Sequence, residues 1–203
     1  VLGGSVSASA TPVAIARVRP DGSTDYEFDV TFDLPNPATL RVENPLVLHT
    51  GSIAAILEPG ASKARELITR LRHTTTICYD PNVRPAIMGN RQRMRPVIDR
   101  MLAVADIVKA SDEDLRWLDP GMPPETVLRN WSRSGPALSV MTCGDRGAIA
   151  YTQHGDRIEL PAEHVQVADT IGAGDAFTAG LLDALWSAEL LGGANRRALG
   201  ELD

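Results

Sequence analysis

Residues 169–182 read DTIGAGDAFTAGLL, and this stretch decides the fold assignment. Gly172 and Gly174 permit a tight turn in which successive backbone N–H groups point to one side. The apolar residues that follow predict a helix that begins directly after the turn. The free amides and the positive dipole end of such a helix suit a phosphate group. Asp175 lies in the same first turn, where a carboxylate can accept a proton from an attacking hydroxyl while the amides stabilise negative charge.

A plainer interpretation is that the glycines make a turn and Asp175 stabilises a helix start, because short Gly-x-Gly-Asp motifs are common. The whole stretch, however, resembles the second signature of the PfkB/ribokinase family of carbohydrate kinases, which constrains residue types along its full length. The resemblance implies that Asp175 is the catalytic base and that Gly172, Ala173 and Gly174 form the anion hole. It also implies that Asp169 helps to hold a monovalent cation. A buried, salt-bridged or capping role for Asp169 stays equally open.

Residues 80–85, Asp-Pro-Asn-Val-Arg-Pro, follow a strand predicted over residues 75–79. They resemble the Asp-Pro-Asn-x-Arg-Pro element of fructokinase-like members of the same family. The resemblance implies that Asn82 and Arg84 reach toward phosphates or sugar. The planar guanidinium fork of Arg suits phosphate, because it offers paired donors. The alternative is an Asp-Pro turn with a solvated Arg84.

Residues 109–114, Lys-Ala-Ser-Asp-Glu-Asp, follow another predicted strand and resemble the family's Asn-x-x-Glu region, which supports Mg²⁺ and phosphate through water. The match is imperfect, because Ser111 stands where Asn is usual and Asp114 where Glu is usual. Ser-x-x-Asp ahead of an apolar stretch is also a helix-capping arrangement, which is the role that we favour for Ser111. For Asp114, support of the metal through water remains an open role.

Residues 142–147, Thr-Cys-Gly-Asp-Arg-Gly, follow a strand predicted over residues 138–141. They resemble the family's Thr-x-Gly-x-x-Gly segment, which borders the nucleotide. The resemblance implies nucleotide contacts for Thr142, Gly144 and Gly147, since glycines let the backbone approach a ligand closely. A hairpin turn into residues 148–151 explains the same pattern.

Strand-like runs alternate with helical patterns from residue 46 to residue 186, which predicts an α/β fold with a mostly parallel sheet covered by helices on both faces. Ligands in such folds bind beyond the carboxyl ends of the strands. Residues 11–18 and 26–31 predict a β-hairpin, because turn-forming Arg-Pro-Asp-Gly-Ser separates them. The resemblance implies a ribokinase-like fold in which this hairpin belongs to a small β-sheet lid over the sugar. An ordinary edge hairpin is the alternative. We therefore expect a partial lid over residues 1–36 and the α/β core over residues 37–203.

The composition excludes several other classes of protein. A net charge of -6 supplies no basic footprint for nucleic acid, and no run is long enough to span a membrane. The two cysteines, Cys78 and Cys143, lack the spacing of a zinc site or a disulfide framework, so buried free thiols are expected. The first residues lack the basic start and apolar centre of a signal peptide, and a cytoplasmic location is expected.

The resemblance implies transfer of the γ-phosphoryl group of ATP to a sugar hydroxyl, with Mg²⁺ and K⁺ as cations and with sugar and ATP as small-molecule partners. A fructokinase-like enzyme is the first hypothesis, and 2-keto-3-deoxygluconate kinase and ribokinase are the alternatives. Relative to the family we expect the chain to be incomplete at both ends. A catalytically incomplete nucleotide- or sugar-binding remnant is therefore the non-enzymatic alternative. A homodimer through the lid strands is compatible with an exposed sheet edge.

Overall fold

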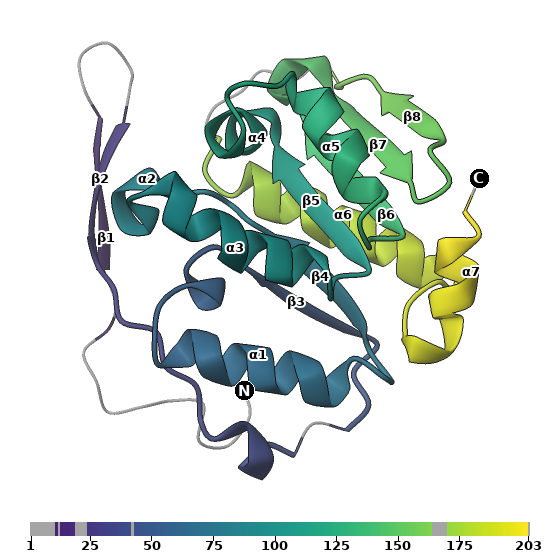
Figure 1. Cartoon of the computed structure of the whole chain (residues 1–203), viewed down its shortest axis with the longest axis horizontal. Helices are drawn as coiled ribbons and strands as arrows, with labels where there is room; N and C mark the ends of the chain where they lie inside the picture. The colour runs from purple at the N-terminus through teal and green to yellow at the C-terminus, as the bar shows by residue number, and fades with distance from the viewer. Residues whose placement is uncertain (1–10, 12, 19–23, 42, 164–169, 203) are drawn as a thin grey trace.

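The computed structural model describes residues 11, 13–18, 24–41, 43–163 and 170–202. A six-stranded sheet with the order β3-β4-β5-β6-β7-β8 forms its centre (Figure 1). The strands from β3 to β6 are parallel, and β7 and β8 are antiparallel to their neighbours. The predicted α/β class with a mostly parallel sheet is therefore confirmed. The strands are β3 (Val47–Gly51), β4 (Thr76–Asp80), β5 (Ile107–Ser111), β6 (Leu138–Thr142), β7 (Ala148–Thr152) and β8 (Arg157–Leu160).

Helices cover both faces of this sheet (Figure 1). Strand side chains alternate between the two faces, as the pleat requires. Tyr79 and Val108 pack with α1, α3, α4 and α5, whereas Cys78 and Ile107 pack with α6 and α7. The helices are α1 (Gly60–Leu71), α2 (Pro85–Met88), α3 (Arg91–Leu102), α4 (Asp112–Leu118), α5 (Pro124–Ser132), α6 (Ala173–Ser187) and α7 (Arg196–Gly200), with 3₁₀ turns at Pro37–Thr39, Ser52–Ala55, Gly144–Arg146 and Gly193–Asn195.

One strand differs from its sequence-based expectation in a way that matters for the site. The pattern predicts a strand over residues 107–108, but β5 continues to Ser111. The apolar pattern is interrupted by Lys109, which is nevertheless buried, with 4% of its surface exposed. The lysine remains inside the fold because it has a buried partner of opposite charge, described below.

The N-terminal hairpin forms a separate two-stranded sheet. In it β1 (Val13–Val18) pairs antiparallel with β2 (Thr24–Asp29), which confirms the predicted hairpin. The predicted turn over residues 19–23 lies outside the described residues. The hairpin stands beside the α/β body, where β2 contacts α2 (Figure 1). Val13 and Ile15 are 47% and 44% exposed, so this sheet presents apolar side chains to solvent.

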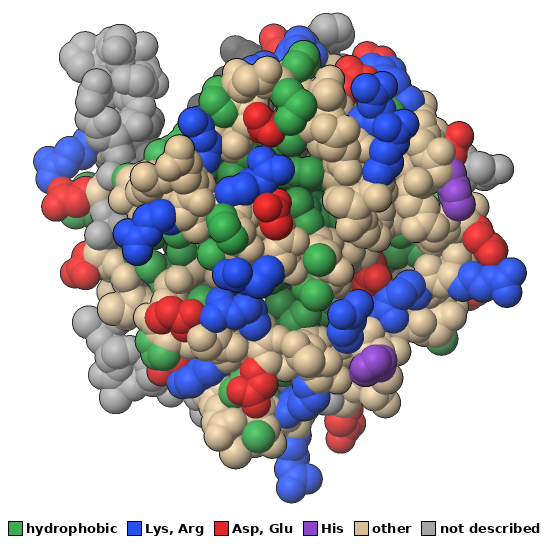
Figure 2. All heavy atoms as spheres, in the orientation of Figure 1, with side chains coloured by type: hydrophobic (Ala, Val, Ile, Leu, Met, Phe, Trp, Pro, Cys, Tyr) green, Lys and Arg blue, Asp and Glu red, His purple; other side chains and the backbone are tan. Residues whose placement is uncertain are grey.

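Acidic and basic side chains share the face shown in Figure 2. Ion pairs link different parts of the chain: Arg95 of α3 contacts Asp119, and Lys63 of α1 contacts Asp33. Both cysteines are buried and free, as expected. Within the described ranges, none of the helices has the length and apolar character needed to cross a bilayer.

Candidate active site

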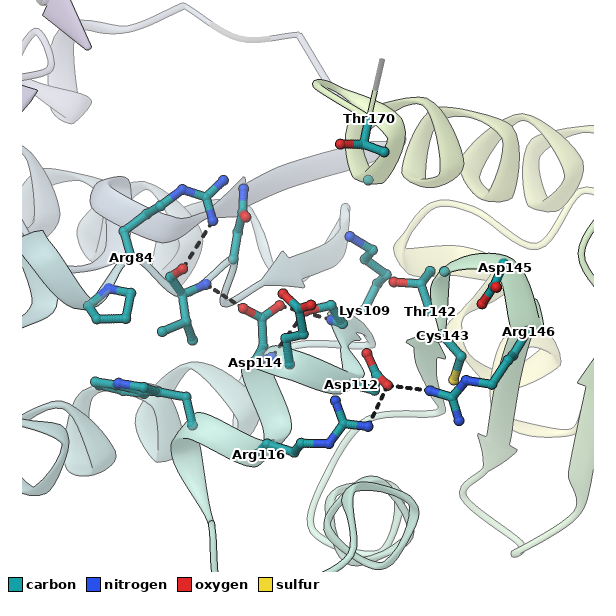
Figure 3. A pocket seen from close by; sticks show the side chains of 18 residues that line it. Arg84, Lys109, Asp112, Asp114, Arg116, Thr142, Cys143, Asp145, Arg146 and Thr170 are labelled. Carbon is teal, nitrogen blue, oxygen red and sulfur yellow. Dashed lines mark hydrogen bonds and ion pairs between the residues drawn. The ribbon is translucent and has the colours of Figure 1, made fainter. Parts of the chain in front are cut away.

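A cavity of about 790 Å³ lies where the predicted ligand-binding loops meet. Its walls come from the segments after β4, β5 and β6 and from the turn that leads into α6 (Figure 3). Because carboxyl ends of parallel strands share one edge of a sheet, sequence segments that are far apart converge there. Six predicted site residues line this one cavity: Asn82, Arg84, Asp114, Thr142, Gly144 and Gly174.

The turn into α6 has the conformation that its glycines allow. Gly172 is the N-cap of α6, with φ of 79°, a left-handed conformation that other residues rarely adopt. The Ala173 amide donates to the carbonyl of Thr170 over 3.1 Å and so is used inside the turn. The amides of Gly174 and Asp175 belong to the first helical turn, which has no acceptors within the helix itself. Thr170 and Gly174 line the cavity, so this end of α6 borders it.

A buried ion pair lies beneath this turn. The Lys109 ammonium donates to Asp80 Oδ2 over 2.9 Å, and each side chain is 5% exposed. Burial raises the pKa of Asp80, and the nearby Lys109 charge opposes that shift. A Cβ atom at Gly174 would lie 2.8 Å from Lys109 Nζ. The ammonium therefore lies close to the backbone of the glycine-rich turn, and a side chain at residue 174 would require the ammonium to shift.

The loop over residues 81–84 brings Asn82 and Arg84 to the cavity. The Asn82 amide donates to Asp80 Oδ1 over 2.9 Å, and Asn82 has a positive φ of 38°, which Asn tolerates better than most residues. The Arg84 guanidinium donates to the Val83 carbonyl over 3.0 Å (Figure 3). Arg84 is thus folded over its own loop, with its remaining donors free to face a ligand.

Ser111 caps α4, as predicted. Its hydroxyl accepts the Asp114 amide over 3.0 Å, and Asp114 Oδ2 accepts the Ser111 amide over 2.9 Å. The other Asp114 oxygen, Oδ1, accepts the Val83 amide over 2.8 Å. Asp114 is 8% exposed. Each of its carboxylate oxygens is therefore already held by a backbone N–H group.

The segment after β6 forms the wall opposite Arg84. Thr142 and Gly144 line the cavity, but Gly147 is absent from the lining residues and lies against the backbone of residues 160–162. Asp112 Oδ2 accepts hydrogen bonds from both Arg116 and Arg146, which form the outer rim (Figure 3). Gly147 has a packing reason to be glycine, since a Cβ there would meet the carbonyl of Leu160 at 1.9 Å.

Asp175 lies in the first turn of α6 and is exposed, but it is absent from the residues that line the cavity. Its charge acts on His49 of β3, as do the charges of Asp80 and Lys109. Desolvation lowers the pKa of His49, and the negative charges of Asp80 and Asp175 partly oppose this shift. The Asp175 carboxylate therefore stands at the turn without lining the cavity, and its charge reaches His49.

Sequence reasoning missed two members of the site, Asp80 and Lys109. A lysine inside an otherwise apolar strand was the available signal, but its partner is 29 residues away in sequence. Asp169 lies outside the described residues, so its predicted cation role stays a prediction.

Comparisons with known proteins agree with this geometry. The model of the pfkB family carbohydrate kinases matches residues 29–199. A fructokinase of Rhizobium leguminosarum bv. trifolii is 35% identical over 183 residues, which cover 90% of this chain and 54% of that protein. The chain thus spans about half the length of this relative.

Solved structures show the same fold. A Vibrio cholerae O395 fructokinase with bound fructose, ADP and calcium ion has a TM-score of 0.72 and 27% identity, covering 85% of this chain and 58% of that chain. A double mutant of that fructokinase, with bound fructose, ADP and potassium ion, has a TM-score of 0.70 and 26% identity, covering 83% of this chain and 56% of that chain. These neighbours support the ribokinase-like fold expected from the sequence. By its sequence match, its fold and the glycine-rich turn at α6, the chain belongs to the pfkB family of carbohydrate kinases.

Proposed function

We propose that this chain carries the nucleotide-binding and phosphoryl-transfer part of an ATP-dependent sugar kinase, with fructose as the acceptor. The observation that carries the proposal is the turn over residues 172–175. It carries the N-terminal amides of α6 and the Asp175 carboxylate, and the buried Lys109 ammonium lies close to its backbone at Gly174. Such an arrangement would bring donors for a phosphoryl group and a base for the attacking hydroxyl to the same turn.

In the proposed reaction the Asp175 carboxylate accepts the proton of a sugar hydroxyl. The hydroxyl oxygen forms a bond to the γ-phosphorus as the bond from that phosphorus to the β,γ-bridging oxygen breaks, and ADP keeps the electron pair. The amides of the turn donate to the oxygens of the phosphoryl group in transfer. Because the Ala173 amide is used inside the turn, the free donors are those that follow it in the first turn of α6.

Positive side chains on the cavity wall would hold the phosphates. The Lys109 ammonium has three N–H groups, and within the described part of the chain one of them is bonded, to Asp80. The Arg84 guanidinium has donors beyond the one used by Val83. Thr142 and Gly144, on the opposite wall, are placed to border the rest of the nucleotide. The predicted nucleotide contact of Gly147 is less well supported, because this residue packs away from the cavity.

The cations of the proposed reaction are Mg²⁺ and K⁺. Among the described residues, no group of three or more His, Cys, Asp or Glu side chains could hold a metal ion. Mg²⁺ in kinase sites is commonly bound by substrate phosphates and water, with few protein ligands. The residues present therefore fit a metal that arrives on the nucleotide and do not fit a dedicated protein site. The potassium ion bound to the fructokinase double mutant supports the use of K⁺, and the role of Asp169 near that ion stays a prediction.

The hairpin β1–β2 is proposed as part of a lid. Its closure over the sugar would exclude water, so that the phosphoryl group passes to the sugar and ATP hydrolysis is suppressed. The exposed Val13 and Ile15 would be covered by a second copy of the chain in a homodimer through the lid strands. A cytoplasmic location is part of the proposal, because ATP and the two free thiols suit a reducing compartment.

The test of this function is ADP release with MgATP and K⁺. The acceptors are fructose, 2-keto-3-deoxygluconate, ribose, glucose and adenosine, each offered to the longest native form of the chain and to residues 1–203. We expect fructose-dependent ADP release from the longer form. Turnover of 2-keto-3-deoxygluconate or ribose in place of fructose would support the proposed kinase activity but contradict fructose as its substrate. Nucleotide binding without turnover of any acceptor would contradict the enzymatic proposal and favour a non-catalytic binding remnant.

A further inference from the structure

The loop over residues 81–84 is held from below by two buried carboxylates. Asp80 Oδ1 accepts the Asn82 amide, and Asp114 Oδ1 accepts the Val83 amide, over 2.9 Å and 2.8 Å respectively. Asp80 is the last residue of β4. Asp114 lies in the first turn of α4, the helix that directly follows the neighbouring strand β5. Consecutive amides of the loop therefore have acceptors that belong to different parts of the chain.

The main chain of Val83 links Asp114 to Arg84. Its N–H donates to Asp114, and its carbonyl accepts a hydrogen bond from Arg84 Nη1 over 3.0 Å (Figure 3). Val83 itself is 7% exposed, so its side chain anchors the loop in the core as well. A change in the Asp114 carboxylate would therefore reach the Arg84 guanidinium through the backbone of a single residue.

The second oxygen of Asp114 is also occupied by the protein. It accepts the Ser111 amide over 2.9 Å in the capping box of α4. A carboxylate with a backbone amide on each oxygen, and 8% of its surface exposed, is held in place by its surroundings. A magnesium ion keeps most of its water shell and requires nearly octahedral ligands, so it is poorly served by an acceptor turned toward backbone amides.

We infer that Asp114 is a positioning residue: it fixes the loop over residues 81–84 so that Arg84 faces the cavity, and it does not support Mg²⁺. The aspartate is one methylene shorter than glutamate, and this length lets it serve the capping box and the loop at once. The inference rests on the proposed function only in treating the ligand of Arg84 as a phosphate. The hydrogen bond between the Val83 amide and Asp114 does not depend on the proposed function.

The first test needs no ligand. Hydrogen exchange is followed in peptides that cover residues 82–84, in the wild-type chain and in Asp114→Asn, whose amide group can accept only one of the two N–H groups. We expect exchange in these peptides to become about tenfold faster, the size set by loss of one charge-assisted hydrogen bond. The matched control is Ser111→Ala, which weakens the same helix cap but leaves both Asp114 oxygens on their amides. Unchanged exchange in Asp114→Asn, or equal acceleration in Ser111→Ala, overturns the inference.

The second test separates positioning from metal support. ATP affinity is measured in EDTA and in excess Mg²⁺ by the fluorescence of Trp117, which lines the cavity. A positioning role predicts about tenfold weaker binding of ATP to Asp114→Asn in both conditions. Metal support predicts a loss in Mg²⁺ alone, and tighter binding in EDTA because a negative charge beside the phosphates has been removed. If the wild-type chain binds no ATP while the exchange result holds, the proposed function fails and the positioning role of Asp114 stands.

Discussion

At the scale of single residues, the glycine-rich turn carries a carboxylate and has an ammonium close to its backbone. Lys109 Nζ lies near Gly174, and Asp175 follows Gly174 directly in the chain. Within the described residues, Lys109 is paired with Asp80 rather than with Asp175. The proposed roles of the two groups, phosphate binding and proton acceptance, are therefore compatible.

The first prediction concerns the proposed base. Asp175→Asn keeps the size of the side chain but removes its ability to take a proton. We expect kcat to fall about a hundredfold or more, with ATP affinity little changed because Asp175 does not line the cavity. Steady-state kinetics of the longest native form, together with ATP titration, provide the measurement. Retention of most of kcat would show that another group accepts the proton.

A second prediction concerns the buried ion pair. Lys109→Met leaves Asp80 charged and without its partner in a site that is 5% exposed, so the free energy of unfolding should fall by about 3–5 kcal/mol. The double variant with Asp80→Asn removes both charges and should recover much of this loss. Its ATP affinity should stay low, because the ammonium beside Gly174 is still missing. Urea denaturation and ATP titration check the two expectations, and a double variant with wild-type affinity would contradict the role of Lys109.

Residue identity alone predicted part of this site. Asn82, Arg84, Asp114, Thr142 and the glycines of the α6 turn were found because they stand in motifs that follow predicted strands. The Lys109–Asp80 pair was not found, since pairing of this kind depends on which strands are neighbours. The hydrogen bond between the Val83 amide and Asp114 was not predicted for the same reason, since the two residues are 31 positions apart in the sequence.

At the scale of elements, α6 combines an N-terminus that borders the cavity with open space beside Gly180, farther along the helix. Gly174 lies against Lys109 Nζ, whereas a Cβ at Gly180, farther along the same helix, would meet no atom within 4 Å. A substitution at Gly174 therefore tests the close contact with Lys109. The same substitution at Gly180 tests only the lower helix propensity of glycine.

The third prediction uses this contrast. Gly174→Ala should displace the Lys109 ammonium and weaken ATP binding by about tenfold or more, because the added Cβ would lie 2.8 Å from Nζ. Gly180→Ala should leave ATP affinity unchanged and raise the free energy of unfolding of residues 1–203 by about 1 kcal/mol, through its higher helix propensity. Thermal melts and ATP titrations of both variants provide the comparison. Equal affinities in the two variants would mean that the close contact is unimportant.

The fourth prediction concerns Glu125 of α5, which ties this helix to the antiparallel strands. Its Oε1 accepts hydrogen bonds from Arg157 of β8 and Tyr151 of β7, over 2.6 Å and 2.7 Å. Arg157 and then Tyr151 hold the pKa of Glu125 below its ordinary value of 4.5. Because the folded-state pKa is the lower one, this stabilisation is present above pH 4.5 and is lost as the pH falls through the folded-state value.

Glu125→Gln should therefore lower the free energy of unfolding by up to about 1 kcal/mol at pH 7, a modest value because the pair is partly exposed. The difference from wild type should shrink as the pH falls below 4.5. Glu159→Gln is the control, since it removes a carboxylate from the same Arg157 within one strand. Denaturation midpoints at several pH values provide the measurement, and a pH-independent difference would contradict the assignment.

At the scale of the whole molecule, alternation of strands and helices predicted the α/β class and the coverage of both sheet faces, because these follow from periodicity. Helices α2 and α7 were not predicted, since α2 has four residues and α7 five, too few for a helical period to show. The position of the hairpin beside α2 was likewise beyond a local pattern, because it is set by the path of the Pro-rich connection and its packing.

The fifth prediction concerns assembly through that hairpin. Val13→Lys places a charge on the exposed apolar face of β1 and should shift a lid-mediated homodimer toward monomer, because burying an unpaired charge is costly. Sedimentation velocity over a range of concentrations compares wild type with this variant. Leu160→Lys, at an exposed apolar position on β8, serves as the control. A wild-type chain that is monomeric at all concentrations would rule out the lid-mediated dimer.

The strand order of the central sheet also bears on how this protein is made. Each strand from β4 to β8 lies next to the strand synthesised just before it, so the sheet can grow outward one strand at a time as the ribosome releases the chain. The loops after β4, β5 and β6 are therefore complete before the turn at residues 172–175 emerges, about a second or two after β8. The segments that form most of the cavity wall therefore leave the ribosome before the turn that carries Asp175.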